Sequence, residues 1–332
     1  MVLAVVTGLG ALVASWLAAG WVLRLSANGR LMDIPNARSA HQTPTPRGGG
    51  IGVVLGFGLA SLVLWRFGWI ATGPLAAVVG GGMAVAGIGL VDDFGHVAIR
   101  WRLLVQVGAV CLGLALLLPP AAAAFPAGWL LAAVGWVWLI NLYNFMDGID
   151  GLAAVEAVTV MVAAAVILIS TQAFGLAVWA GTLAAACAGF LFWNWPPARI
   201  FMGDVGSGYL GYVLGVLALA GGESGAISPW SWAILPAVFV SDATLTLLRR
   251  MWRRERWWRP HSAHAYQHLA RRYGHRVVTL AVAAVNLFWL LPWAWLAASD
   301  SARGGLWLAL AYGPLVVVAF RAGAGLPPAG RK

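Results

Sequence analysis

Four polar side chains interrupt an apolar stretch of the chain at NLYNFMDGIDGL, residues 141 to 152. Two are amides, Asn141 and Asn144, and two are carboxylates, Asp147 and Asp150, and each is three residues from the next. On a helix, steps of three residues keep Asn141, Asn144 and Asp147 on one broad face, whereas Asp150 rotates away unless the helix ends at the glycines around it. Amide and carboxylate oxygens are ligands that Mg²⁺ accepts. The stretch therefore predicts the end of a helix that reaches into a polar, metal-competent site.

Two adjacent carboxylates, Asp92 and Asp93, follow another apolar stretch in GLVDDFGHVAIRWR. Neighbouring carboxylates repel each other, so a divalent cation or nearby arginines such as Arg100 and Arg102 would stabilise them. A solvated loop start is the alternative, and the pair alone does not decide between the two.

A third group lies in FWNWPPARIFMGDVGSGYLG, where Asn194 and Asp204 flank a short loop that carries Arg199. The glycines of GDVGSG allow backbone N–H groups to approach an anion, and Asp204 is available as an oxygen ligand for Mg²⁺. A single glycine-rich turn is weak evidence, but it gains weight beside two other acidic groups.

The longest basic segment, RRMWRRERWWRPHSAHAYQHLARRYGHR, contains His261, His264 and His268 at positions i, i+3 and i+7. One helix could direct all three the same way. Histidines among arginines suit a phosphate-bearing ligand better than zinc, because both side chains donate charge-assisted hydrogen bonds to phosphoryl oxygens. An amphipathic helix at the membrane surface is the alternative. Arg47, in PTPRGGG, is another candidate anion contact, although a plain turn explains it equally well.

Membrane helices are expected to position these groups. Of 332 residues, 61% are hydrophobic and 10% are charged, with a mean hydropathy of +0.83, and a backbone that spans a bilayer has to satisfy its own hydrogen bonds. We expect an all-α, polytopic membrane protein with one domain over residues 1–332 and a short cytoplasmic tail at 321–332. About eleven spans are expected, and ten are also compatible with the pattern. The eleven are residues 2–23, 48–65, 73–91, 103–119, 128–146, 152–170, 175–193, 208–222, 230–248, 277–297 and 305–320.

The basic residues predict the orientation of these spans. With the N-terminus outside, 19 of the 21 Lys and Arg residues fall on the cytoplasmic side, as the positive-inside rule requires. The same topology places the three acidic groups and the histidine segment at the cytoplasmic face. Membrane lipids are therefore expected partners of the basic loops, and nucleic acid is not, because no soluble basic domain is present. Asp242, within an expected span, is expected to face the same cavity, whereas the place of Glu156 is ambiguous.

Together these groups predict phosphoryl transfer at the inner membrane surface. Metal and cations would offset the charge of phosphates, and the protein would mainly position the reactants. One reactant is then expected to be a lipid phosphate and the other a soluble, nucleotide-linked group. A membrane transporter is the rival class, but its charged groups should lie near the midplane rather than gather at one face.

Five motifs, in order, resemble the polyprenyl-phosphate N-acetylhexosamine-1-phosphate transferases of glycosyltransferase family 4. They are PTPRGGG, DDFG, NLYNFMDGIDGL, FMGDVGSGYLG and HSAHAYQHL, and the resemblance runs from about residue 30 to residue 280. Within that family the forms of PTPRGGG and HSAHAYQHL look more like the bacterial branch that initiates O-antigen and teichoic acid than like the phospho-MurNAc-pentapeptide transferases.

The resemblance implies a reaction. Undecaprenyl phosphate and a UDP-N-acetylhexosamine would give undecaprenyl-diphosphate-sugar and UMP, with Mg²⁺, or Mn²⁺ in its place, at a bacterial inner membrane. Such a step would begin a cell-envelope polysaccharide such as the O-antigen of lipopolysaccharide. A phospho-MurNAc-pentapeptide transferase is the alternative activity, and a homodimer is left open.

The resemblance also implies roles for individual residues. Asp204 would bind the metal, and Asn144 would help to hold it or the diphosphate. Asp92 and Asp93 match the family's paired aspartates, one as a base for the lipid phosphate and the other as a positioning group or metal neighbour. Asp147 and Asp150 match acids of the nucleotide pocket, completing the expected catalytic set. The expected substrate-binding set is Asn144, Asn194, Arg47, Arg100, Arg102, His261, His264 and His268.

Overall fold

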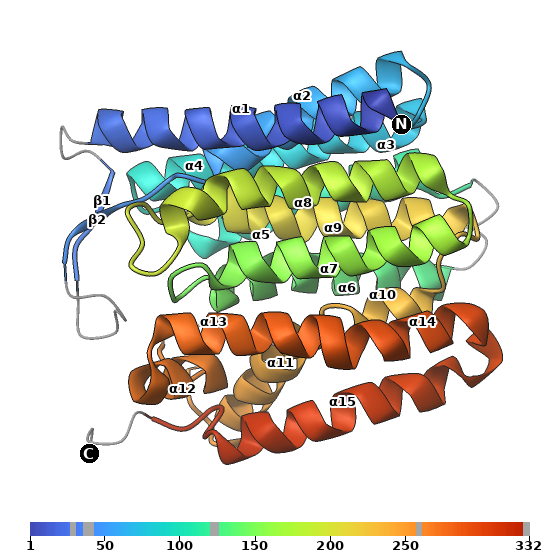
Figure 1. The fold of residues 1–332 in the computed structure, drawn as a ribbon. Coiled ribbons are helices and arrows are strands. Elements are labelled where there is room, and N and C mark those ends of the chain that lie inside the picture. The colour runs from blue at the N-terminus through green and yellow to red at the C-terminus, as the bar shows by residue number, and fades with distance from the viewer. Residues whose placement is uncertain (27–30, 36–42, 120–125, 257–260, 328–332) are drawn as a thin grey trace.

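The chain folds into one bundle of long helices that run roughly side by side (Figure 1). The structure is a computed structural model, and it describes residues 1–26, 31–35, 43–119, 126–256 and 261–327. The first half comprises α1 (Val2–Ser26), α2 (Ile51–Arg66), α3 (Thr72–Ala77), a π-helical turn η1 (Val78–Gly82), α4 (Met83–Phe94), α5 (Ile99–Leu117), α6 (Pro126–Met146) and α7 (Leu152–Ser170). The second half comprises α8 (Phe174–Asn194), α9 (Asp204–Glu223), α10 (Pro229–Ile234), α11 (Ala237–Trp252), α12 (Ala265–Tyr273), α13 (His275–Ala284), a π-helical turn η3 (Val285–Leu290), α14 (Leu291–Ser299), a 3-10 turn η4 (Ser301–Arg303) and α15 (Gly304–Arg321).

The expected membrane-embedded, all-α architecture is confirmed. Every one of the eleven expected windows coincides with helix, and nine helices of the described chain are long and apolar enough to cross a bilayer. The two remaining windows are α2, which has 16 residues, and the window at 230–248, which breaks at Leu235 and Pro236 into α10 and α11. Proline has no N–H to donate and clashes with the preceding turn, so the helix restarts after it. The number of true spans and their orientation stay predictions.

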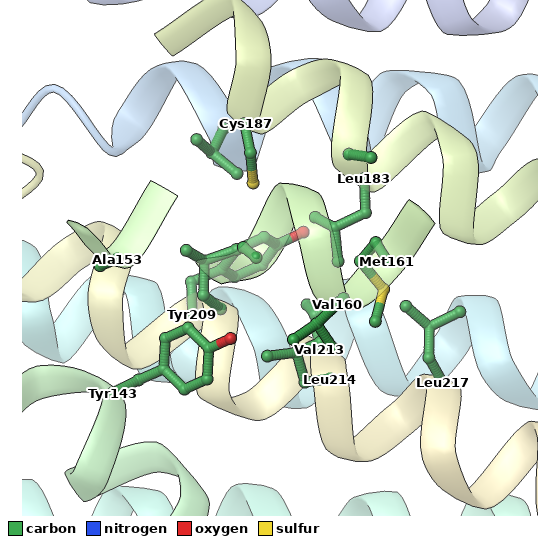
Figure 2. Packing of buried hydrophobic residues seen from close by; sticks show 14 of the residues in the cluster. Tyr143, Ala153, Val160, Met161, Leu183, Cys187, Tyr209, Val213, Leu214 and Leu217 are labelled. Carbon is green, nitrogen blue, oxygen red and sulfur yellow. The ribbon is translucent and has the colours of Figure 1, made fainter. Parts of the chain in front are cut away.

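A dense apolar core lies around α9, the most buried of the nine long helices. This helix packs against α4 and α6, and α7 and α8 pack against each other beside it. Figure 2 shows Tyr143, Met161, Leu183 and Tyr209 meeting in this core. Large side chains on the outer helices are exposed, as a surrounding lipid phase requires.

The candidate polar groups all lie at one end of the bundle, opposite the N-terminus. A two-stranded antiparallel pair, β1 (Met32–Asp33) and β2 (Thr45–Pro46), and the short helix α12 both lie at this end (Figure 1). The last residues of α4 and α6 and the first residues of α9 reach the same end, since Asn144 of α6 and Asp93 of α4 both form a hydrogen bond with Asp204 of α9. In the predicted tail at 321–332, Arg321 ends α15 and residues 322–325 form a turn at this end, while residues 328–332 lie outside the described part of the chain.

Candidate active site

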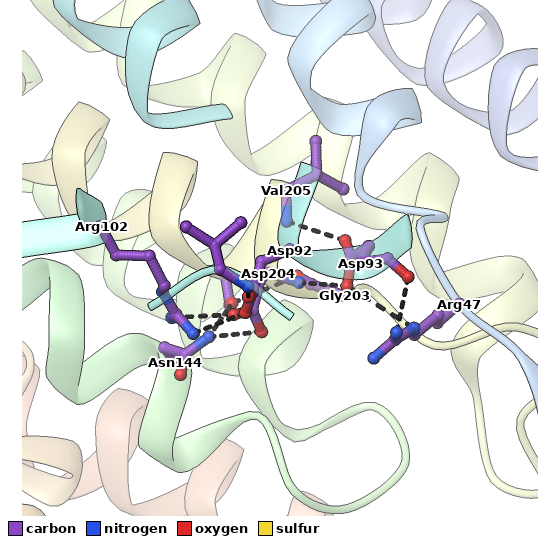
Figure 3. Close-up of polar contacts among 10 residues, drawn as sticks. Arg47, Asp92, Asp93, Arg102, Asn144, Gly203, Asp204 and Val205 are labelled. Atoms are coloured by element: carbon purple, nitrogen blue, oxygen red, sulfur yellow. Dashed lines mark hydrogen bonds and ion pairs between the residues drawn. The ribbon is translucent and has the colours of Figure 1, made fainter. Parts of the chain in front are cut away.

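Three oxygen-bearing side chains from three helices converge at this end of the bundle. Asp92 comes from the last turn of α4, Asn144 from the last turn of α6, and Asp204 is the first residue of α9. Asn144 donates a hydrogen bond from Nδ2 to Oδ1 of Asp204 at 2.7 Å. Arg102, in the first turn of α5, contacts both carboxylates (Figure 3). Its Nη1 is 2.6 Å from Oδ2 of Asp92, and its Nη2 is 2.8 Å from Oδ2 of Asp204.

The second aspartate of the pair, Asp93, faces into the protein rather than toward this cluster. Its side chain is 1% exposed, and its two oxygens accept hydrogen bonds from the backbone N–H groups of Asp204 and Val205, both at 3.1 Å. These are the first free amides of α9, where a carboxylate is stabilised by the helix dipole. Asp93 therefore caps α9 and fixes the position of Asp204, and the expected role of one of the paired aspartates as a base for the lipid phosphate stays a prediction.

The glycine-rich GDVGSG turn binds an anion, as its sequence predicts, but that anion is the carboxylate of Asp93. Gly203 has a φ of +77°, and a Cβ there would lie 2.5 Å from Oδ2 of Asp93. The next glycine, Gly206, packs on Gly50 of the PTPRGGG motif so closely that a Cβ on it would lie 2.6 Å from the Cα of Gly50. Arg47 of the same motif donates to the backbone oxygen of Asp93 and lies 3.9 Å from its carboxylate. These motifs thus hold α9 in place.

The helix carrying the NLYNFMDGIDGL stretch ends at Met146, so Asp147 and Asp150 lie in the turn that follows. Burial and the nearby carboxylates, first among them Asp204, raise the pKa of Asp147 well above its ordinary value. Asp150 points elsewhere: its Oδ2 accepts from the N–H of Ala198 at 3.1 Å and is 3.3 Å from Nδ1 of His275. The pKa of Asp147 thus responds to the charge of Asp204, whereas Asp150 ties its turn to the next loop and to α13.

Asn194 is a structural residue in this arrangement. It is buried, its Oδ1 accepts from the N–H of Gly151 at 2.9 Å, and its Nδ2 donates to the backbone oxygen of Ile200 at 2.9 Å. It therefore joins the two loops that carry Asp150 and Asp204, which leaves both polar ends of its amide engaged with the backbone.

The expectation that one helix carries His261, His264 and His268 is wrong. Helix α12 begins at Ala265, so His261 and His264 precede it, and their rings stack with centroids 4.9 Å apart. The cause is Asp242, whose oxygens accept from the N–H groups of Ala265 and Tyr266, both at 2.8 Å, and thereby fix the start of the helix.

The three histidines consequently have different surroundings. His264 is buried, with Nδ1 3.4 Å from Oδ1 of Asp242. His268 lies 3.2 Å from the backbone oxygen of Leu326, after α15. Burial lowers the pKa of His261 to about 3, and the neighbouring His264 and Arg250 act in the same direction. Without a bound anion His261 is therefore uncharged at neutral pH, and its expected contact with a phosphate stays a prediction.

Arg100 and Arg102 are two residues apart in the sequence, and their side chains have different surroundings. Arg102 bridges the two carboxylates, whereas Arg100 is exposed and its guanidinium lies over the Trp101 ring, 5.6 Å from the centroid. An α-helix directs residues two apart to different faces, which explains the difference. The structure thus places Arg102 in the cluster and Arg100 at its periphery.

Several functional partners were missed from sequence. Ser207 accepts from Nδ2 of Asn144 at 3.2 Å, Gln106 accepts from Asn141 at 2.8 Å, and His275 contacts Asp150. Ser207 stands in GDVGSG, one turn after Asp204, so helical spacing would have found it. Gln106 and His275 have no comparable signal, because their partners lie far away in the sequence.

The donor set suits a magnesium ion. Among the described residues, no three His, Cys, Asp or Glu side chains form a complete metal site. Mg²⁺, however, is commonly bound by one or two carboxylates together with substrate phosphates and water. Asp204 and Asp92 supply two carboxylates, Asn144 supplies an amide, and the cationic Arg102 shows that the two carboxylates converge on one positive charge.

Comparison with known proteins places the chain in a family. Residues 75–222 match the family model described as glycosyl transferase family 4, a range that includes Asp92, Arg102, Asn144 and Asp204. A phospho-N-acetylmuramoyl-pentapeptide-transferase of Desulforudis audaxviator is 30% identical over 268 residues, which cover 69% of this chain and 77% of that protein. The chain belongs to glycosyl transferase family 4.

Two further relatives carry different names within this family. A probable undecaprenyl-phosphate N-acetylglucosaminyl 1-phosphate transferase of Bacillus subtilis is 28% identical over 276 residues, covering 79% of this chain and 76% of that protein. A decaprenyl-phosphate N-acetylglucosaminephosphotransferase of Mycolicibacterium smegmatis is 32% identical over 234 residues, covering 63% of this chain but only 57% of that protein. The residues of the acidic cluster thus lie inside the range that matches the family, and the names of both relatives combine a polyprenyl phosphate with a sugar phosphate.

Proposed function

We propose that the chain transfers an N-acetylhexosamine 1-phosphate from a UDP-sugar to undecaprenyl phosphate, with Mg²⁺, and releases UMP. The observation that carries the proposal is the convergence of Asp92, Asn144 and Asp204 around one cation at the end of a membrane bundle. The names of the Bacillus subtilis and Mycolicibacterium smegmatis relatives support a polyprenyl phosphate as acceptor and N-acetylglucosamine as the sugar.

The chemistry is a displacement at the β-phosphorus of the UDP-sugar. An oxygen of the lipid phosphate forms the new P–O bond, the bond to the α-phosphate breaks, and UMP leaves with the electron pair. The second pKa of a phosphate monoester is about 6, so the lipid phosphate is largely ionised at neutral pH and needs no strong general base. This agrees with the engagement of Asp93 in the cap of α9.

The chain's own residues would position the reactants and balance their charge. Asp204 and Asn144, with Asp92, would hold Mg²⁺, which supplies a positive charge for the diphosphate when bound. Arg102, beside them, supplies a cation that can contact phosphoryl oxygens. Asp93 holds the first turn of α9, and with it Asp204, in one position.

The setting of the proposed reaction is a bacterial plasma membrane. The product, undecaprenyl-diphosphate-sugar, would be the first membrane-bound intermediate of a cell-envelope polysaccharide such as O-antigen. The end of the bundle that bears Asp92 and Asp204 would then face the cytoplasm, where UDP-sugars are made, in agreement with the distribution of Lys and Arg in the sequence.

A phospho-MurNAc-pentapeptide transferase is the second candidate, favoured by the 30% identity to the Desulforudis audaxviator protein. The same catalytic cluster serves either donor, because the chemistry at the diphosphate is identical. The two candidates differ only in the sugar and the peptide attached to it.

The test is release of UMP by the purified chain from a panel of UDP-sugars in the presence of undecaprenyl phosphate. UDP-N-acetylhexosamines are expected to react with Mg²⁺ and not with EDTA, and UDP-MurNAc-pentapeptide is expected not to react. Asp204→Asn should abolish the reaction. Asp300→Asn removes a carboxylate between α14 and η4, in an ion pair with Arg303, and should leave the rate unchanged. Absence of UMP from every donor would refute the proposal.

A further inference from the structure

Every carboxylate oxygen of the Asp92 and Asp204 pair already has a donor. Oδ1 of Asp92 accepts from the N–H of Val97 at 2.7 Å, and Oδ1 of Asp204 accepts from Asn144. The remaining oxygen of each residue contacts Arg102, at 2.6 and 2.8 Å (Figure 3). The guanidinium thus contacts both carboxylates, which also lie within hydrogen-bonding distance of each other.

This contact stabilises the site electrostatically. Two carboxylates from separate helices repel each other when they approach, and a cation between them offsets that repulsion. A guanidinium suits the position because its planar fork contacts two carboxylates at once. Arg102 therefore acts in the substrate-free protein as a resident cation, and a metal ion bound to the same two oxygens would compete with it for space and for charge.

We propose that Arg102 occupies the cation position of the site in the substrate-free protein and that Mg²⁺ binds Asp92 and Asp204 only when this guanidinium withdraws. The proposal rests on the metal site of the proposed function. Withdrawal needs only side-chain rotation, because Arg102 is 23% exposed and its long side chain starts from the first turn of α5. Asn144 would turn its amide oxygen toward the ion in the same step.

The donor substrate gives the displaced guanidinium a new partner. A diphosphate beside Asp204 presents oxygens to which an arginine binds readily. The metal frees the Arg102 guanidinium from the carboxylates, and the diphosphate offers that guanidinium new oxygens to contact. Binding of metal and binding of UDP-sugar should therefore strengthen each other. Without the nucleotide the metal should bind weakly, which would keep the site from holding an ion before its substrate arrives.

The test is a titration of the full-length chain, in detergent, with Mn²⁺ in place of Mg²⁺, followed by the electron paramagnetic resonance signal of free Mn²⁺. Arg102→Gln should bind Mn²⁺ about tenfold more tightly than the wild type without nucleotide, which corresponds to about 1.4 kcal/mol. Addition of UDP should tighten Mn²⁺ binding in the wild type and have a smaller effect in Arg102→Gln. Arg100→Gln is the matched control, because it removes the same charge from the same turn but from a side chain that lies over Trp101.

Equal or weaker Mn²⁺ binding by Arg102→Gln than by the wild type would overturn the inference. Arg102→Lys is the second variant should the first fold poorly: an ammonium cannot bridge both carboxylates as a guanidinium does, so Mn²⁺ should again bind more tightly than in the wild type. Asp204→Asn identifies the site, since it should remove the binding. Loss of the inference leaves the proposed function standing if the wild type still releases UMP with Mg²⁺, and that assay is scored separately.

Discussion

Asp93→Asn is expected to destabilise the protein more than the same change at the adjacent Asp92. The carboxylate of Asp93 accepts from two amides at the start of α9, and an asparagine keeps one acceptor and turns an NH₂ group toward the other amide. Loss of one hydrogen bond to a buried charged group costs about 1.5–3 kcal/mol. The expected cost is therefore about 1.5–3 kcal/mol.

The assay is the thermal midpoint of the purified protein in detergent, followed by the fluorescence of its 20 tryptophans. Asp93→Asn should lower the midpoint by about 5 °C or more. Asp92→Asn is the matched control: it removes a neighbouring, partly exposed carboxylate in an ion pair, which is worth about 0–1 kcal/mol. Equal midpoints for the two variants would refute the assignment of Asp93 as the cap of α9.

Three further predictions follow from buried contacts outside the acidic cluster. Glu156→Gln should leave the thermal midpoint nearly unchanged, since the amide oxygen can still accept from Asn286 (2.6 Å), while Glu156→Ala should cost about 2–4 kcal/mol through a cavity and an unpaired polar group. His261→Gln should reduce the loss of stability between pH 7 and pH 5: because the folded pKa of His261 is about 3, only the unfolded chain binds that proton below about pH 6.5, and stability falls with pH. Gly325→Ala should lower the thermal midpoint by several degrees, roughly 1–3 kcal/mol, because φ is +77° there and a Cβ would lie 2.7 Å from that of Arg249. Equal thermal midpoints for Glu156→Gln and Glu156→Ala would contradict the role of the Asn286 hydrogen bond. An unchanged pH dependence in His261→Gln would contradict the lowered pKa of His261. An unchanged midpoint in Gly325→Ala would contradict the close approach to Arg249.

The fold was largely predictable because hydrophobic length alone decides where a chain can cross a bilayer. All eleven expected windows are helical, and the one that breaks does so at Pro236. The convergence of Asn144, Asp204 and Asp92 was also predictable in outline, because each polar group stands at the end of an apolar stretch and the basic residues place those ends on the same side.

What could not be predicted is the direction in which each acidic side chain points. Asp92 and Asp93 are adjacent and chemically identical, yet one faces the cluster and the other caps α9, whose amides lie more than 100 residues further along the chain. Asp242 was expected to face the same cavity, but it caps α12 instead and thereby removes His264 from the expected helix. In each case the partner is a backbone N–H group, which carries no signature in the sequence.

Arg47 contacts Asp93, and Arg102 contacts Asp92 and Asp204. The difference in burial between these carboxylates explains why only Arg102 can give way to a metal ion. Asp93 is 1% exposed and has two backbone donors besides Arg47, so removal of its charge partner would leave a buried charge in a fixed position, at high cost. Asp92 and Asp204 are 14% and 27% exposed, and water can stabilise them while Arg102 leaves. The two sites therefore complement each other. Asp93 holds α9 in a fixed position, and this keeps Asp204 in place while Asp92 and Asp204 exchange the guanidinium of Arg102 for a metal ion.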